Sequence, residues 1–120
     1  MPSPTRHRWL ETEQLSEAII VTFNARIIID EKAIQDIGKE LAGLVDSLGQ
    51  PRLLLNFNGV EHLSSSMLAK IIGLHKRTKA AGGRLALCAI NPDLYEVFKI
   101  TQLNKMLSIF PNEQEALQTF

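Results

Sequence analysis

The stretch that decides the fold is RLLLNFNGVEHLSSSMLAKIIGLHKRTKAAGGRLALCAI, residues 52–90. It begins and ends with apolar runs, at residues 53–55 and 85–90, in which polar residues do not alternate with apolar ones. Such runs are typical of strands that are covered on both faces, as in a parallel sheet. Between them, residues 64–81 have apolar side chains at helical spacing and end at a Gly-Gly pair. The stretch therefore predicts a strand, a helix and a second strand parallel to the first.

The sequence before this unit predicts two more strands and a helix. Residues 18–23 are apolar and β-branched, as in a strand, and residues 8–11 suit a brief edge strand. Residues 26–29 either continue the strand past a bend or form an apolar loop. Asp30 suits a helix N-cap, and residues 30–48 follow it with one apolar helical face.

The sequence after the unit predicts a helix, a short strand and a final helix. Asn91 and Pro92 suit the N-cap and the first position of a helix over residues 92–99. Residues 106–110 suit a last short strand, and residues 113–119 a helix that begins with capping-box spacing. Repeated strand-helix-strand units predict an α/β fold, a mainly parallel or mixed β-sheet with about four α-helices packed on it. We expect five apolar side chains of these elements to be buried in the core, namely those of Ile37, Leu53, Leu55, Ile71 and Leu87.

Length and composition place the chain among single soluble domains. The 120 residues include 13 Lys and Arg against 13 Asp and Glu, which gives a formal net charge of zero. This balance argues against direct nucleic-acid binding. The sequence contains no apolar run of the ~20 residues that a membrane span needs, so we expect no membrane insertion. A single cysteine suits the reducing cytoplasm. We expect a disordered lead at residues 1–7 and one domain over residues 8–120.

The sequence contains no pattern typical of a catalytic, cofactor or metal site. It has no phosphate-binding glycine loop, no HExxH and no cluster of Cys and His at ligand spacing. His7, His62 and His75 lie far apart in the sequence, and Cys88 lies within an apolar run where cysteine behaves as a buried hydrophobe. We therefore predict that the protein is not an enzyme and that it carries no cofactor.

Three consecutive serines, Ser64, Ser65 and Ser66, stand where the loop after the first strand meets the helix. One of them is expected to cap the helix, and the others are tolerated in its first turn. The same position suits a phosphoryl group, because a helix N-terminus offers unpaired N–H groups and the positive end of the helix dipole.

Around these serines the chain resembles the STAS-domain anti-anti-sigma factors, the anti-sigma factor antagonists of bacteria. Their hallmark is a strand, a short loop and Asp-Ser-Ser-Gly-Leu at the start of a helix. Here residues 53–57, 58–63 and Ser64-Ser65-Ser66-Met67-Leu68 follow in that order. The turn, strand and Asn-Pro helix start at residues 82–92 also match, and the resemblance extends over residues 18–117. Ser64 replaces the usual aspartate, Met67 replaces the glycine, and residues 25–30 replace a Gly-Glu-Leu-Asp segment.

The resemblance implies partner switching. The unphosphorylated protein would bind an anti-sigma factor, often a serine protein kinase, and would release it when phosphorylated, and a serine phosphatase would reverse the modification. By position Ser65 matches the phosphorylated serine, with Ser64 and Ser66 as alternatives. The implied partner-binding residues are Asn24, Arg26, Ile28, His62, Ser64, Ser65, Ser66 and Met67. The alternative is a STAS subunit that does not act on a sigma factor, either a stressosome-type scaffold or a component of a lipid ABC transporter.

Three consecutive isoleucines, Ile27, Ile28 and Ile29, carry a prediction of their own. Side chains alternate between the two sides of an extended segment, so all three cannot point inward. We expect at least one to be exposed near the start of the second helix, in a patch for docking or homodimer formation.

Overall fold

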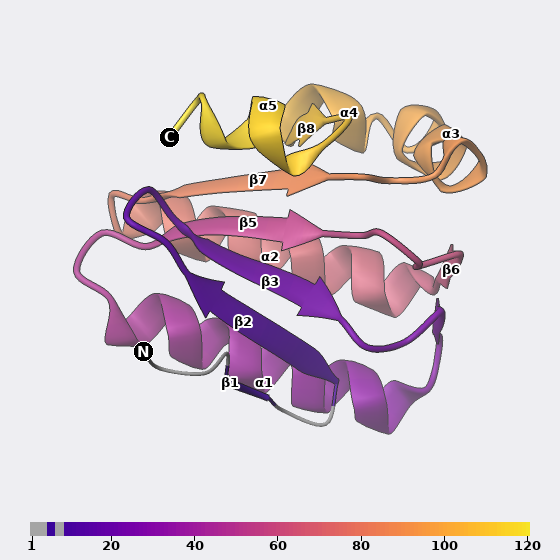
Figure 1. Ribbon diagram of the computed structural model, residues 1–120. Helices are drawn as coiled ribbons and strands as arrows, with labels where there is room; N and C mark the ends of the chain where they lie inside the picture. Colours follow the sequence, from indigo (N-terminus) through magenta and orange to yellow (C-terminus); the bar gives the residue numbers. More distant parts are fainter. Residues whose placement is uncertain (1–4, 7–8) are drawn as a thin grey trace.

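A mixed β-sheet forms the centre of the protein in the computed structural model, which describes residues 5–6 and 9–120 (Figure 1). The strands of this sheet are β1 (Thr5–Arg6), β2 (Leu10–Gln14), β3 (Ile19–Phe23), β5 (Arg52–Asn56), β7 (Arg84–Cys88) and β8 (Ser108–Phe110). They lie side by side in the order β1-β2-β3-β5-β7-β8. The four strands from β3 to β8 are parallel, and β1 and β2 add antiparallel pairings at one side. The predicted mainly parallel, mixed sheet is confirmed.

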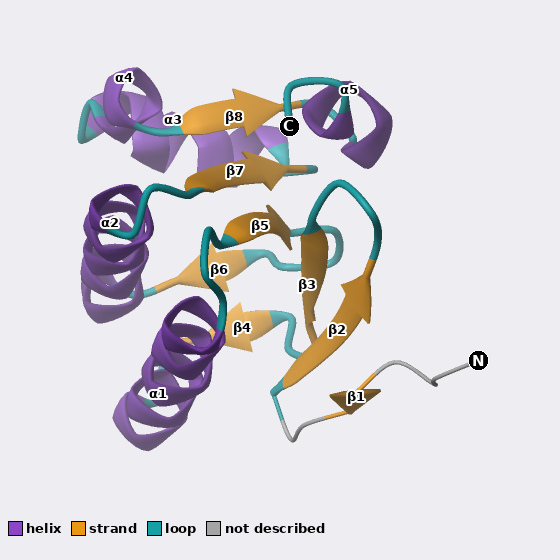
Figure 2. Cartoon of the chain, turned by 90° about the vertical axis from the view of Figure 1, so that its left-hand side faces the viewer, coloured by secondary structure: helices purple, strands orange, loops and turns teal. Residues whose placement is uncertain are grey.

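Helices cover both faces of this sheet, but unequally. Figure 2 shows α1 (Glu31–Ser47), α2 (Ser65–Ala80), α3 (Pro92–Ile100) and α4 (Leu103–Met106) on one face, and α5 (Glu113–Leu117) on the other. The four predicted helices are all present, with ends that differ from the predicted ones by a few residues. Each of the four begins after a residue whose side chain accepts a backbone N–H three positions later.

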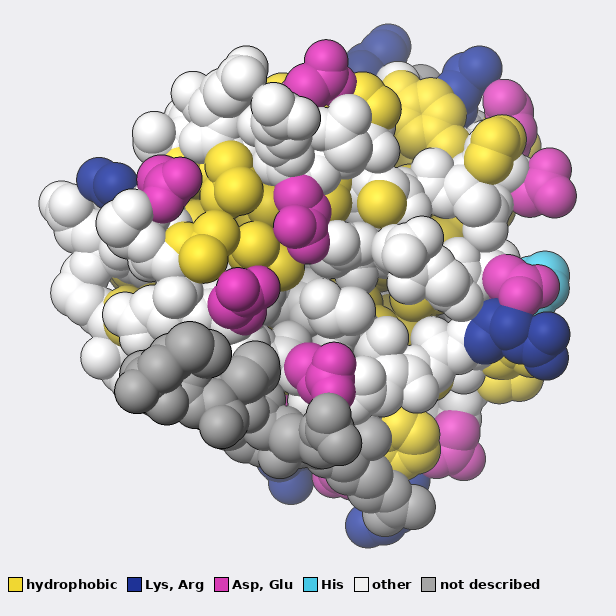
Figure 3. Space-filling model, viewed as in Figure 1, with side chains coloured by type: hydrophobic (Ala, Val, Ile, Leu, Met, Phe, Trp, Pro, Cys, Tyr) yellow, Lys and Arg dark blue, Asp and Glu magenta, His cyan; other side chains and the backbone are white. Residues whose placement is uncertain are grey.

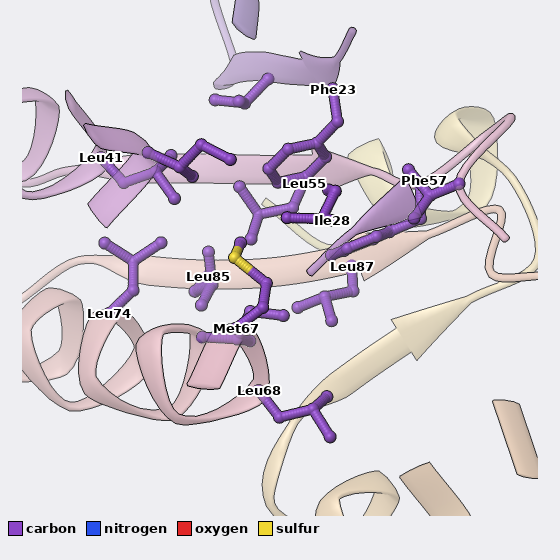
Figure 4. Packing of buried hydrophobic residues seen from close by; sticks show 14 of the residues in the cluster. Phe23, Ile28, Leu41, Leu55, Phe57, Met67, Leu68, Leu74, Leu85 and Leu87 are labelled. Atoms are coloured by element: carbon purple, nitrogen blue, oxygen red, sulfur yellow. The ribbon is translucent and has the colours of Figure 1, made fainter. Parts of the chain in front are cut away.

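The apolar strands have neighbours on both sides, as their composition predicts. Leu53 and Leu55 of β5 point toward α1 and α2, whereas Leu54 between them packs with Ala86 and Ala116 on the face that α5 covers. Figure 4 shows the larger cluster, in which side chains of the helices interlock with those of the sheet. The residues predicted to form the core are at most 1% exposed: Ile37, Leu53, Leu55, Ile71 and Leu87.

The predicted strand at residues 106–110 is partly wrong. Met106 is the last residue of the short helix α4, and only Ser108–Phe110 forms a strand. Gln102 before α4 has a left-handed backbone with φ of 63°, which turns the chain between α3 and α4. Propensity gave no sign of this turn, because glutamine rarely adopts a positive φ.

The N-terminal predictions need two adjustments. Within the lead expected to be disordered, residues 1–7, Thr5–Arg6 forms β1 opposite Glu11 and Thr12. The brief edge strand expected at residues 8–11 is the longer strand β2, and β1 pairs along its outer side. Residues 1–4 and 7–8, and with them His7, lie outside the described part of the chain.

Candidate functional site

The loops at the carboxyl ends of β3, β5 and β7 lie at one edge of the sheet, at the right of Figure 1. Helices α1, α2 and α3 begin there, so their N-terminal ends face the same region. Figure 3 shows basic, acidic and histidine side chains close together at this edge. The carboxyl edge of parallel strands is where α/β proteins place their binding sites.

A second, two-stranded sheet joins two of these loops. β4 (Ile27–Ile28) pairs in parallel with β6 (His62–Leu63), so that Ile27 lies opposite His62 and Ile28 opposite Leu63. The backbone of Arg26 accepts the Glu61 N–H at 2.7 Å, and that of Ile28 accepts the Ser64 N–H at 3.0 Å. This pairing fixes the start of α2 beside the start of α1. It also settles the open prediction for residues 26–29, because after a bend the chain forms a separate strand.

The three serines occupy different environments at the start of α2. Ser64 is the N-cap, and its Oγ accepts the Met67 N–H at 3.2 Å. Ser65 is the first residue of the helix and is exposed, whereas Ser64 and Ser66 are half-buried. The structure thus separates the serine that holds the helix start from the serine that faces solvent.

The start of α2 has a positive electrostatic character that no carboxylate of its own first turn offsets. That turn contains no acidic residue, and the Ser64 cap satisfies the N–H of Met67. The N–H groups of Ser65 and Ser66 lie in the first turn, where a helix offers no acceptor of its own. Together with the dipole of a helix of 16 residues, these groups favour an anion at this position.

The structure brings together only some of the residues that the resemblance implies for partner binding. Arg26 and His62 are exposed and adjacent: Arg26 directly precedes β4, His62 is the first residue of β6, and the Arg26 carbonyl accepts the His62 N–H at 3.3 Å. Asn24 is also exposed, but its backbone N–H donates to Trp9 O, toward β2. Ile28 and Met67 are at most 2% exposed. Figure 4 shows both side chains pointing into the core, so neither presents a surface to a partner.

The isoleucine prediction is confirmed for exposure. Ile27 and Ile29 are 43% and 60% exposed, whereas Ile28 between them is buried. Within β4, the neighbouring residues Ile27 and Ile28 point to opposite sides, as in any extended strand. Two large apolar side chains therefore lie in water within a few residues of the cap of α1 and beside the start of α2.

Other titratable candidates do not form a second centre. Cys88 is buried, and burial, with a smaller contribution from Glu113, raises the pKa of its thiol to about 12. Partial burial, with a contribution from Lys79, lowers the pKa of His75 on α2. Among the described residues, no group of three or more His, Cys, Asp or Glu side chains is arranged to hold a metal ion. No helix in the described part of the chain is long and apolar enough to cross a membrane.

Sequence reasoning missed a group of residues next to His62. Glu61, Asp93 and Val97 line a hollow between β6 and the first turns of α3. The signal that could have located them is topological. The Asn-Pro helix start follows β7 directly, and the carboxyl ends of parallel strands meet at one edge, so α3 had to begin near the serines.

A comparison with protein-family models identifies the family of this chain. The STAS domain model matches residues 9–116, and the chain therefore belongs to the STAS domain family. This match covers the central sheet from β2 onward and the helices as far as Ala116 in α5.

Individual relatives agree with this assignment. A proposed anti-sigma factor antagonist of Bordetella bronchiseptica, BtrV, is 32% identical over 91 residues, which cover 74% of this chain and 75% of BtrV. Among solved structures, an anti-sigma-factor antagonist (STAS) domain protein from Planctomyces limnophilus gives a TM-score of 0.80 at 21% identity, covering 92% and 96% of the two chains. The phosphorylated form of the Bacillus cell fate determinant SpoIIAA gives a TM-score of 0.69 at 20% identity, covering 92% and 97%. The two structures establish the likeness of fold.

Proposed function

We propose that the protein is an anti-sigma factor antagonist that releases its partner when Ser65 is phosphorylated. The observation that carries the proposal is an exposed serine at the uncompensated N-terminal end of α2. The names of the relatives support it, since BtrV and a protein of Paenibacillus polymyxa that is 31% identical over 65 residues are described as antagonists of this kind.

Ser65 is the proposed phosphate acceptor because Ser64 caps the helix and Ser66 is less accessible. A phosphate on Ser64 would disturb the oxygen that accepts the Met67 N–H, and Ser66 is half-buried. A kinase needs the hydroxyl to reach its active site, and the side chain at the first helical position extends into solvent. Ser65 therefore combines access with a position where added negative charge stabilises the helix.

The proposed partner surface lies next to this serine, at the β4–β6 pair. The exposed side chains of Ile27 and Ile29 supply apolar area, and those of Arg26 and His62 supply polar contacts. Large exposed apolar side chains near a polar rim are typical of protein interfaces. Ile28 and Met67 act from the core, where they fix the positions of β4 and the first turn of α2.

Phosphorylation would break the complex without unfolding the domain. The phosphate meets N–H groups that the helix leaves unpaired, so the domain stays folded. In the complex, the same doubly charged group is desolvated against a surface that fits a neutral hydroxyl, which costs several kcal/mol. The partner is an anti-sigma factor with serine-kinase activity, a serine phosphatase restores the hydroxyl, and the protein acts in the cytoplasm as a substrate rather than a catalyst.

The test is calorimetric titration of the variants against the anti-sigma factor that copurifies with the wild-type chain. We expect Ser65→Ala to bind as wild type does and Ser65→Asp to bind at least about 100-fold more weakly, since each tenfold corresponds to about 1.4 kcal/mol. Ser16→Asp, in the exposed turn between β2 and β3, is the matched control and should leave the affinity unchanged. Equal affinities for the wild-type, alanine and aspartate forms at Ser65 would contradict the proposal.

A further inference from the structure

A hollow of about 330 Å³ lies between β6 and the beginning of α3, beside the serine-bearing edge. Its apolar part consists of Leu63, Leu94 and Val97. Leu94 is buried, Leu63 is half-buried and Val97 is 37% exposed, so these side chains make a lining that remains accessible to solvent. The proposed phosphorylation at Ser65 makes no use of this feature.

The wall of the hollow is held in place by Asn91. Its Nδ2 donates to Val60 O at 3.0 Å, and its Oδ1 accepts the Leu94 N–H at 2.8 Å. The same amide thus caps α3 and ties it to the loop before β6. The hollow is therefore formed before any partner arrives, which reduces the ordering cost of binding.

The polar part of the hollow is acidic. Asp93 stands in the first turn of α3 and is exposed, and Glu61, in the loop before β6, lines the same hollow and is also exposed. Arg26 faces Glu61 with Nε at 3.4 Å from Oε2, but both side chains are about half exposed or more. Such a surface pair is weak and exchanges readily with another cation. Asp93 has no corresponding cation among the residues that line the hollow, and His62 is the remaining titratable group there.

We propose that this hollow binds an arginine side chain presented by the partner protein. The inference rests on the proposed function only in assuming that a partner covers this edge. An arginine fits because its aliphatic stem packs on apolar side chains while its guanidinium stays at a polar rim. Its planar set of five N–H donors can serve two carboxylates at once, which the single ammonium of lysine does less well.

The position of the hollow makes it a determinant of partner choice. His62 borders the hollow and also pairs with Ile27, and the chain runs from β6 directly into Ser64. A partner that covers Ser65 and Ile27 therefore lies next to His62, which lines the hollow. Arginine anchors in preformed pockets are frequent among the residues that dominate interface energies.

A direct test uses a small probe and needs no partner. We expect N-acetyl-L-arginine N′-methylamide to shift the amide NMR signals of His62, Leu63, Asp93 and Leu94 in a saturable way, whereas the neutral citrulline analogue should not. Asp93→Asn should lower the affinity for the probe at least about threefold. Glu96→Gln is the matched control, because Glu96 lies on the same helix, pairs with Lys99 and does not line the hollow. Equal shifts with the citrulline analogue, or equal affinity in Asp93→Asn, would overturn the proposal.

A second test uses the protein partner and separates this inference from the proposed function. Asp93→Asn should weaken binding of the copurifying anti-sigma factor about tenfold, and Glu96→Gln should not. If Ser65→Asp does not alter the affinity for the partner while the arginine probe still binds, the proposed phosphorylation switch is wrong and arginine binding in the hollow is supported. If Ser65→Asp abolishes binding of the partner while Asp93→Asn binds as wild type does, arginine binding in the hollow is wrong and the phosphorylation switch is supported.

Discussion

Two of the helix starts at the carboxyl edge, those of α1 and α2, have similar structures but different charges. Each follows a strand of the two-residue β4–β6 pair. Each has an N-cap whose side-chain oxygen accepts the N–H three residues on, Asp30 Oδ2 from Ala33 at 2.9 Å and Ser64 Oγ from Met67 at 3.2 Å. Local geometry therefore does not distinguish them.

Their charges do. The first turn of α1 has the carboxylate of its cap, Asp30, and that of Glu31 beside it, so its dipole is compensated permanently. The first turn of α2 has no carboxylate, and its polar side chains are the hydroxyls of Ser64, Ser65 and Ser66. The sequence motif that the chain resembles has an aspartate in place of Ser64, so this chain lacks a carboxylate at that position. The carboxylates of α1 stabilise its first turn, whereas in the proposed function a phosphate on Ser65 would compensate the dipole of α2.

The largest difference between the two helix starts lies in the side chain of the third residue. It is Ala33 in α1 and Met67 in α2, and only the methionine reaches far into the core (Figure 4). We expect Met67→Ala to lower the free energy of unfolding by about 3 kcal/mol, because a fully buried side chain is replaced by a cavity. Urea denaturation followed by circular dichroism measures this change.

Met67→Leu is the control for that substitution. It keeps most of the volume and should cost less than about 1.5 kcal/mol. If both substitutions had effects below this value, Met67 would not anchor the first turn of α2. The two helix starts would then differ in charge alone.

Most of the fold could be predicted because its signals are local. The apolar runs around Leu54 and Leu87 mark strands covered on both faces, and the Asn91-Pro92 pair marks a helix start, whatever the rest of the chain does. The family motif also located the serines. Assigning Ile28 to the partner surface was less successful, because the motif gives a position in the sequence and not the direction of a side chain.

The parts that were missed depend on contacts between distant segments. A strand of two residues, such as β4, has too few residues for a period, and it exists because Arg26 and Ile28 accept hydrogen bonds from the loop before α2. Helix α4 follows from the left-handed backbone of Gln102. The hollow joins Glu61 and Asp93, which are 32 positions apart in the sequence, and no local pattern connects them.

Removing the two N-caps tests whether they stabilise their helices to the same extent. We expect Asp30→Ala and Ser64→Ala each to cost about 1 kcal/mol, because each leaves one N–H of the first turn without its acceptor. Only the cost at Asp30 should fall as salt is added, since its charge also interacts with the helix dipole. Thermal denaturation at two salt concentrations measures both. The same salt dependence at the two sites would mean that the carboxylate acts only as a hydrogen-bond acceptor.

Giving α2 the charge that α1 already has should produce the smallest effect. Aspartate and serine are comparable N-caps, so Ser64→Asp keeps the hydrogen bond to Met67 and adds a carboxylate at the positive end of the helix. We expect this variant to be more stable than wild type by about 0.5 kcal/mol at low salt, with the gain fading as salt is added. Ser16→Asp, in a turn remote from any helix start, should show no such gain. Chemical denaturation of the three proteins at two salt concentrations measures the difference. If Ser64→Asp is no more stable than wild type, other charges already compensate the dipole of α2. The missing carboxylate would then not explain why a phosphate is favoured at Ser65.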